Sequence, residues 1–274
     1  MNLDDTIGDI LRKARVSTGT TMEAAATAAG LSVDAYRQFE ETGKAPAGTR
    51  WVELGARLTL DGGRLQRQHD GWMPEPVDLS KWCELRMLTS TGDGVTVNCY
   101  LVWDEVTREA ALFDTGYDGA AILSLIDANQ LQLKHVFITH SHGDHIAALG
   151  AVRERFPKAR IHSGNKNAPV EHRIRSNDFI MLGSLRVTNR ETPGHAEDGV
   201  TYIVGTWPED APHVAMVGDA LFAGSMGGAK EHLELARQKV REQIFSLPAE
   251  TLVCPGHGPL TTVAQEKANN PWFG

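Results

Sequence analysis

The chain has 274 residues, of which 41% are hydrophobic, so it is long enough to bury a sizeable core and to form a large and a small domain. Its 27 Lys and Arg residues stand against 35 Asp and Glu residues, and the formal net charge of −8 indicates no general affinity for nucleic acid or an anionic membrane. The three cysteines form no CxxC pair and the first residues resemble no signal peptide, so we expect a cytoplasmic protein that is not inserted in a membrane.

Residues 1–70 carry the patterns of a small all-helical domain. Apolar residues recur at helical spacing over 7–14, and a second helix is expected over 21–29, where Gly30 ends it. Ser32 is well placed to cap a third helix over 33–41. The pattern predicts a helix, a tight turn and a helix.

This segment resembles the helix-turn-helix module of the Cro and phage-repressor type, on the residues of four stretches: 11–15, 25–32, 36–40 and 43–46. In that family the third helix enters the major groove of DNA. The resemblance therefore implies that the residues in contact with DNA would be Ser32, Val33, Tyr36 and Arg37.

The charge of this segment argues for weak DNA binding. Nine basic residues stand against ten acidic ones over residues 1–70, a net charge of −1. Asp34, Glu40 and Glu41 lie beside Arg37, whereas affinity for DNA depends largely on neutralising phosphates. Three roles stay open: DNA binding, dimerisation or another protein contact, and a cap on the enzyme. We expect a homodimer.

A connector follows the helical patterns. Gly62-Gly63, a polar run, and then Pro74 and Pro76 are typical of a connecting segment over 61–82. We place the linker at 71–82 and a second domain at 83–274.

The second domain alternates strand and helix patterns. Strands are expected over 83–88, 95–103 and 109–113, followed by a helix over 120–128, a strand over 133–138, a helix over 146–156 and a strand over 160–162. A second set comprises strands over 179–190, 200–204 and 214–217, a helix over 231–245 and a strand over 251–253. Two such halves predict an α/β fold of two sheets packed face to face with helices outside.

Four potential metal ligands lie within six positions directly after the apolar run 135–138. His140 and His142 are two residues apart, so on an extended backbone their rings fall on one side. Asp144 and His145 follow a glycine at the start of a helix and point into the same space from a second direction. Imidazole and carboxylate ligands suit zinc, iron or manganese, and the geometry predicts two ions.

Three more candidates lie on turns further along the chain. His195 follows Pro193-Gly194, Asp219 follows the strand over 214–217, and His257 lies between two glycines after Pro255. Each alone is more typical of a hydrogen-bonded structural residue. Their order and their loop settings favour a metal site.

These motifs together resemble the metallo-β-lactamase superfamily, and within it the glyoxalase II-like hydrolases. The resemblance covers residues 83–274 and rests on Asn98-Cys99-Tyr100-Leu101, Asp114-Thr115-Gly116, the cluster from His140 to His145, Thr192-Pro193-Gly194-His195, the stretch 218–225, and Pro255-Gly256-His257-Gly258-Pro259. It implies an αββα sandwich preceded by the small helical domain.

The resemblance also implies a ligand set for two divalent ions, with zinc expected and iron or manganese as alternatives. One ion would be held by His140, His142 and His195, the second by Asp144, His145 and His257, and Asp219 would bridge them. The two carboxylates expected to act in catalysis are Asp144 and Asp114. Asp114 would accept a hydrogen bond from a ligating histidine or order the loop.

Such a site would use a hydroxide between the ions to cleave the ester or thioester of a small acyl substrate, or to open a lactone. Tyr100 or Tyr117 could stabilise the oxyanion, and Arg173 and Arg175 could contact an anionic substrate. A persulfide dioxygenase is the alternative enzyme: one iron held by His195, Asp219 and either His140 or His142. A non-enzymatic alternative is a sensor, in which the metal domain binds a ligand and the helical domain reports to DNA.

Overall fold

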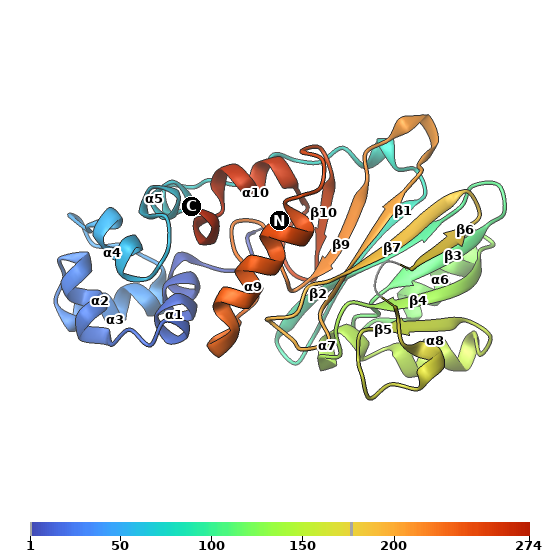
Figure 1. Ribbon diagram of the computed structural model, residues 1–274, viewed down its shortest axis with the longest axis horizontal. Helices are drawn as coiled ribbons and strands as arrows, with labels where there is room; N and C mark the ends of the chain where they lie inside the picture. Colours follow the sequence, from blue (N-terminus) through green and yellow to red (C-terminus); the bar gives the residue numbers. More distant parts are fainter. Residues whose placement is uncertain (1, 176–177) are drawn as a thin grey trace.

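The computed structural model describes residues 2–175 and 178–274. Helices α1 to α5 form one end of the elongated molecule, and two β-sheets packed face to face form the rest (Figure 1). Helices cover the outer faces of both sheets. The predicted fold class, an αββα sandwich preceded by a small all-helical region, is confirmed.

The helical region is built from short, capped helices: α1 (Ile7–Ser17), α2 (Met22–Ala29), α3 (Val33–Thr42), α4 (Trp51–Arg57) and α5 (Gly62–His69). Thr6 and Asp9 form a capping box at the start of α1. The Ser32 hydroxyl accepts a hydrogen bond from the Ala35 backbone, so it caps α3 as predicted. Gly30 ends α2 in the left-handed conformation that glycine tolerates best.

Of the predicted DNA contacts, Tyr36 is wrong, and the charge of Arg37 is paired with an acidic residue. Tyr36 is fully buried because it lies on the apolar face of α3, edge-on to Phe39, so it cannot reach a base. Arg37 is exposed but donates a 2.7 Å hydrogen bond to Asp34 on the same helix. The exposed surface of α3 therefore offers little free positive charge.

The connector predicted from residue 61 onward begins too early, because α5 occupies Gly62–His69. The Asp61 side chain accepts a hydrogen bond from the Arg64 backbone and caps this helix. A side chain at Gly62 would collide with the Trp51 carbonyl. Gly62 thus permits close packing of α4 and α5, whereas the sequence suggested a connecting segment.

The first sheet has the strand order β1-β2-β3-β4-β5, and the second has the order β11-β10-β9-β8-β7-β6. The strands of the first sheet are β1 (Leu85–Gly92), β2 (Val95–Trp103), β3 (Glu109–Phe113), β4 (Gln132–Ile138) and β5 (Arg160–Ser163). Those of the second are β6 (Phe179–Leu182), β7 (Leu185–Glu191), β8 (Val200–Gly205), β9 (Val214–Gly218), β10 (Leu252–Pro255) and β11 (Thr261–Thr262).

Three expected elements are subdivided. The helix predicted over 146–156 consists of α7 (Gly143–Ile146) and α8 (Leu149–Arg155). The strand predicted over 179–190 is the hairpin β6–β7, which turns at Gly183 with φ +57°. The helix predicted over 231–245 consists of a 3-10 turn (Lys230–His232), α9 (Leu233–Lys239) and a π-helical turn (Val240–Ile244).

Alternating side chains of the strands form three apolar layers. Leu101 and Leu112 face outward, where they pack against α6 (Gly119–Ala128) and α8. Phe113, Phe137 and Tyr202 fill the space between the two sheets. Outward-facing residues of β8 and β9 pack against α9 and α10 (Val263–Asn269), and this third layer continues into the helical region.

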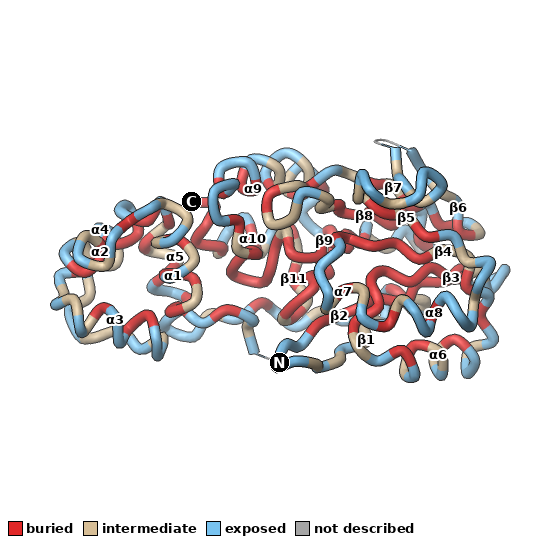
Figure 2. The backbone as a smooth tube through the Cα atoms, turned by 90° about the horizontal axis from the view of Figure 1, so that it is seen from below, coloured by how far each residue is buried: buried red, intermediate tan, exposed pale blue. Residues whose placement is uncertain are grey.

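The C-terminal segment fastens the helical region to the sandwich. The Asp61 backbone donates to the Pro271 carbonyl at 2.8 Å, and Arg64 donates to the carbonyls of Asn270 and Phe273. Buried backbone runs from the helices into the sheets in Figure 2, and the C-terminus lies beside α5 in Figure 1. Both parts therefore share one core.

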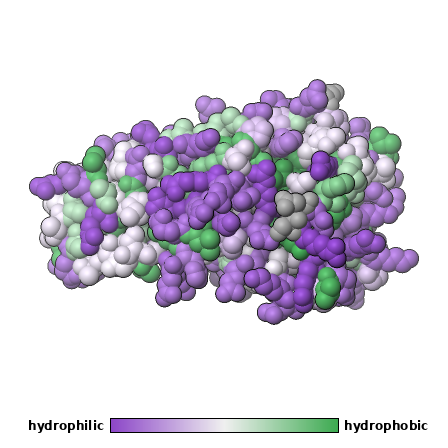
Figure 3. All heavy atoms as spheres, in the orientation of Figure 1, coloured by the Kyte–Doolittle hydropathy of each residue, from purple (hydrophilic) through white to green (hydrophobic). Residues whose placement is uncertain are grey.

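Hydrophilic side chains predominate on the face of the molecule drawn in Figure 3, and apolar ones form small, separate patches. No helix in the described part of the chain has the length and apolar character that crossing a bilayer requires.

Candidate metal centre

The predicted ligands meet at one edge of the sandwich, where strands end. His140 follows β4, His195 follows β7, Asp219 follows β9 and His257 follows β10. Parallel pairing of β9 with β10 brings the carboxyl ends of these two strands together. The sheets thus gather residues that are more than one hundred positions apart in the sequence.

The first group consists of His140, His142 and His195, whose ligand atoms lie within 4.8 Å of one another. His142 Nδ1 lies 3.0 Å from His140 Nε2 and 3.0 Å from His195 Nε2. His140 is buried and His142 is exposed, so the group opens toward solvent on one side.

The second group consists of Asp144, His145 and His257. Asp144 Oδ2 lies 3.3 Å from His257 Nε2 and 3.7 Å from His145 Nε2. Asp144 and His145 project from α7, which follows the first two histidines directly, as the sequence predicted.

Asp219 lies between the two groups. Its Oδ2 atom is 3.3 Å from His195 Nε2 and 3.4 Å from His257 Nε2, and its Oδ1 atom is 3.2 Å from His145 Nε2. One carboxylate therefore faces histidines of both groups, which is the position expected for a bridging ligand.

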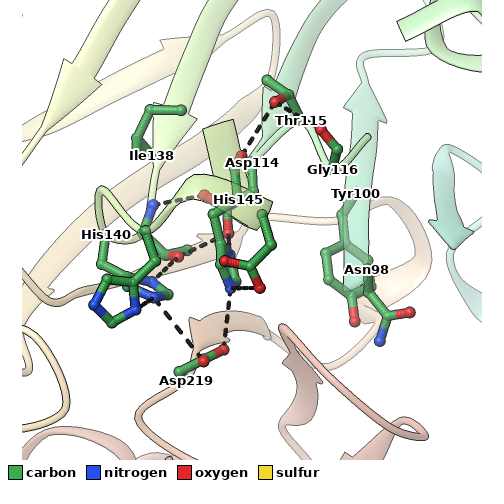
Figure 4. Close-up of polar contacts among 12 residues, drawn as sticks. Asn98, Tyr100, Asp114, Thr115, Gly116, Ile138, His140, His145 and Asp219 are labelled. Atoms are coloured by element: carbon green, nitrogen blue, oxygen red, sulfur yellow. Dashed lines mark hydrogen bonds and ion pairs between the residues drawn. The ribbon is translucent and has the colours of Figure 1, made fainter. Parts of the chain in front are cut away.

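Asp114 stands behind the ligands and does both things that the sequence suggested (Figure 4). Its Oδ2 atom lies 2.8 Å from His145 Nδ1, and its two oxygens accept hydrogen bonds from the Thr139 backbone and hydroxyl at 2.8 and 2.7 Å. It orients the imidazole and ties the loop to β4. Asp114 adopts φ +56°, a conformation that an aspartate tolerates better than most residues.

Backbone carbonyls orient two more histidines. The His195 Nδ1 atom lies 3.0 Å from the Gly228 carbonyl and that of His257 lies 2.6 Å from the Thr96 carbonyl. A carbonyl can only accept, so in both rings the proton sits on Nδ1 and Nε2 is left as the metal-binding atom.

Asn98 and Tyr100 of β2 hold the turn that carries His257. Tyr100 donates to the Pro255 carbonyl at 2.6 Å, and the Asn98 amide donates to Pro255 and to Gly258. Tyr100 is buried with its hydroxyl occupied, so the suggested oxyanion role is wrong for this residue. Tyr117 is only half-buried, and the charge of Asp144 acts on it, so it keeps that role as a candidate.

The electrostatics of the site favour a bound cation. Burial opposes charge on Asp219, yet the imidazoles of His145 and His257 beside it hold its pKa well below the ordinary value. The His257 imidazole, with its Nε2 atom 3.3 Å from Oδ2, lowers the pKa of Asp144 to about 2. Burial lowers the pKa of His140 to about 3, which leaves this imidazole neutral and able to bind metal.

Two buried atoms show that the residues fit a metal ion. His145 Nε2 and Asp219 Oδ1 have no hydrogen-bond partner within the described residues, although buried polar atoms are normally satisfied. Both belong to ligand groups and lie 3.2 Å apart. Two electron-pair donors aimed at one space are explained by an ion that both would bind.

A cavity of about 520 Å³ opens beside His195 and can hold a small organic molecule. Lys166, Arg173, Glu197 and His232 are among the residues that line it. Arg173 is thus positioned for the suggested substrate contact, whereas Arg175 lines a different cavity, next to His162.

Reasoning from the sequence missed the residues that hold the ligands in place. Thr139 carries no metal-binding group, and the carbonyls of Thr96 and Gly228 carry no sequence signal at all. Asn98 and Tyr100 could have been found, because they belong to a motif that the resemblance already included.

The chain also matches a known protein family. The family model described as the metallo-beta-lactamase superfamily matches residues 92–257. Persulfide dioxygenase ETHE1, mitochondrial, of Bos taurus is 30% identical over 226 residues, which cover 79% of this chain and 83% of that protein. Hydroxyacylglutathione hydrolase GloC of Haemophilus influenzae is 26% identical over 201 residues, which cover 64% of this chain and 92% of that protein.

A solved structure agrees in fold. The crystal structure of TTHA1623 in a di-iron-bound form aligns with a TM-score of 0.53 and 26% identity, over 68% of this chain and 99% of that chain. The family match over residues 92–257 includes every candidate ligand from His140 to His257. The family match begins at residue 92, so the helix-turn-helix resemblance of residues 1–70 stays a prediction.

Proposed function

Because the chain belongs to the metallo-β-lactamase superfamily, we propose that it is a hydrolase that holds two divalent ions, zinc by preference. The substrate is a small acyl compound, and the bond that breaks is an ester or a thioester. The residues at the centre are those of the two ligand groups and Asp219.

The position of Asp219 carries this proposal. Its Oδ1 faces His145 and its Oδ2 faces His195, so a single buried carboxylate serves two groups of imidazoles. A shared carboxylate is the usual way to keep two ions a few ångströms apart. The similar protein TTHA1623 was solved in a di-iron-bound form, which supports a site for two ions here.

Two divalent ions, when bound, supply a hydroxide near neutral pH and polarise the scissile carbonyl. The protein residues do the remaining work. Asp114 holds the proton on His145 Nδ1, which keeps Nε2 directed at the centre. The cavity beside His195 holds the acyl part of the substrate against the first group.

The nature of the ligands supports ester or thioester cleavage. All the candidate ligands are imidazoles or carboxylates, a set that suits hydrolytic metals. The relative named hydroxyacylglutathione hydrolase supports a thioester in particular. Lactone opening uses the same parts and remains within this proposal.

The test combines metal analysis with a substrate panel. We expect about two zinc ions per chain and hydrolysis of at least one member of a panel of thioesters, esters and lactones. His142→Ala should abolish turnover and lower the metal content, whereas replacing the exposed His213 should change neither. Full activity of His142→Ala on every wild-type substrate would refute the assignment.

A persulfide dioxygenase is the second candidate, because the bovine enzyme of that name is similar over 79% of this chain. One iron per chain and oxygen consumption with glutathione persulfide would favour it over the hydrolase. The second ligand group argues for the hydrolase, since Asp144, His145 and His257 converge although one iron would leave most of them unused.

The partner of the helical region is a separate proposal. We keep a homodimer as the expected state, to be checked by sedimentation. DNA binding is the weaker alternative, since Arg37 is paired with Asp34 and the segment has a net charge of −1. A sensor that reports to DNA would require that binding.

A further inference from the structure

The segment that precedes α1 reaches the metal centre. It leaves α1 and runs toward the sandwich (Figures 1 and 2). A Cβ atom placed on Gly258 would lie 3.1 Å from the Asp4 backbone nitrogen and 3.3 Å from the Asp4 Cβ. Asp4 therefore lies directly on the turn that carries His257.

The next residue, Asp5, fixes this segment firmly. Asp5 is 6% exposed, and its carboxylate accepts hydrogen bonds from Ser225 at 2.5 Å and from Lys13 at 2.6 and 2.9 Å. Lys13 also donates to the Met226 carbonyl at 3.2 Å. Both partners in the sandwich belong to the loop from Asp219 to Gly228, which supplies the bridging carboxylate and the carbonyl that orients His195.

Aromatic contacts continue this connection to a ligand. The Lys13 ammonium stands 5.3 Å from the centre of the Phe222 ring. The same ring meets His257 edge-on, with centroids 5.5 Å apart. The wall beside His257 is thus assembled jointly from the helical region and the sandwich.

Asp4 differs from Asp5 in that it is exposed. Nearby atoms nevertheless raise its pKa by partial desolvation, and the charges of His257 and Asp219 act on it. Because Asp4 lies against Gly258, the residue next to His257, its charge acts at the second ligand group.

We propose that the segment before α1 forms the wall of the metal centre on the His257 side, and that Asp4 is a specificity-determining residue for the charge of the leaving group. Only the experiment with substrates rests on the proposed hydrolysis. A negative side chain there disfavours substrates with an anionic leaving group and favours neutral or cationic ones. The helical region then serves the enzyme by shaping its substrate choice.

The test uses two acetyl thioesters that differ in charge, acetylthiocholine and S-acetylthioglycolate, with the zinc-loaded 274-residue chain. Asp4→Asn should lower kcat/KM for the cationic substrate and raise it for the anionic one, by about fivefold each, as expected for one charge at a distance of several ångströms. Glu41→Gln removes the same charge from the far side of the helical region and should leave the ratio unchanged.

A second arm does not depend on turnover. Calorimetry measures the binding of thiocholine and of thioglycolate to the zinc-loaded protein, and Asp4→Asn should shift the ratio of the two Kd values in the same direction. If neither thioester is cleaved, the proposed hydrolysis of such substrates fails, and the thiols still decide the role of Asp4. A ratio within twofold of wild type in this arm overturns the inference.

Discussion

Single hydrogen bonds decide which nitrogen of each histidine faces the metal centre. Asp114 at His145, the Gly228 carbonyl at His195 and the Thr96 carbonyl at His257 each contact Nδ1. In His142 the order is reversed, and Nδ1 itself points at the first group. The ligand geometry is thus fixed before any ion binds.

Asp114→Asn tests this arrangement. An asparagine has a single carbonyl oxygen, so it cannot accept from the Thr139 backbone and from His145 at once, as the two carboxylate oxygens do. We expect zinc affinity to fall by about 10-fold to 100-fold, measured by competition with a chelator. Asp118→Asn is the matched control, because Asp118 caps α6 and asparagine caps helices equally well. Equal affinity in both variants would contradict the role of Asp114.

Glu266 is a buried carboxyl away from the ligands. Burial raises its pKa from 4.5 to about 7, although Asn270, Gly224 and Thr261 all donate hydrogen bonds to it. Because the folded pKa lies above the unfolded one, the stabilisation is fully present below about pH 4.5 and is lost as the pH rises toward 7.

Glu266→Gln should therefore remove this pH dependence. The glutamine oxygen can accept from Gly224 and Asn270 while its amide donates to Thr261. Between pH 4.5 and 7.5 the free energy of unfolding of the wild type, measured with urea, should fall by about 3 kcal/mol more than that of the variant. The control variant Glu250→Gln, at an exposed position, should show the same pH dependence of stability as the wild type. If Glu266→Gln also showed the wild-type pH dependence, the pKa of Glu266 would not be raised.

The candidate ligands could be predicted from the sequence because spacing and neighbouring glycines mark them. His140 to His145 follow a strand, and His195 and His257 lie on Gly/Pro turns. The groups that orient them could not, since a backbone carbonyl such as that of Gly228 carries no residue-specific signal. Asp4, Asp5 and Lys13 were missed for a similar reason: their partners lie more than two hundred positions away.

At the scale of elements, the loop from Asp219 to Gly228 depends on α1. Asp5→Ala would leave the Lys13 ammonium and the Ser225 hydroxyl without their carboxylate acceptor. We expect a loss of about 2 kcal/mol in the free energy of unfolding and faster release of zinc to a chelator.

The control for this prediction is Asp34→Ala, which removes an exposed ion pair with Arg37 and should cost less than about 1 kcal/mol. Lys13→Met should reproduce the faster zinc release, because it removes the other half of the connection. Zinc release at the wild-type rate in both Asp5→Ala and Lys13→Met would show that the loop holds its position without α1.

Periodicity predicted most of the elements, and the errors have a common cause. Gly62-Gly63 indicates a joint in sequence, but a helix forms there because Asp61 caps it and α4 packs closely against it. The strand expected over 179–190 is a hairpin because Gly183 turns and the Asp104 side chain accepts from Ser184. Both outcomes depend on tertiary contacts that local patterns do not contain.

At the scale of the whole molecule, the helical region and the outer layer of the second sheet form one apolar cluster. Leu58 and Leu65 belong to it together with Val263 and Trp272. Arg237 on α9 also donates to Thr59 at 3.1 Å. A separately folding DNA-binding domain on a linker would lack such a shared core, so the two parts should unfold together.

This predicts a single thermal transition for the 274-residue chain. Ellipticity at 222 nm, which reports strongly on the helices, should change at the same temperature as zinc release, which reports on the metal centre. Trp272→Ala should lower both midpoints together, since it leaves a cavity of a large buried side chain and costs about 3–5 kcal/mol. Phe179→Ala, at an exposed position of β6, should shift neither. Two separate transitions, with the helices melting first while zinc stays bound, would show that the helical region is an independent domain, and the wall beside His257 would then have to stand without it.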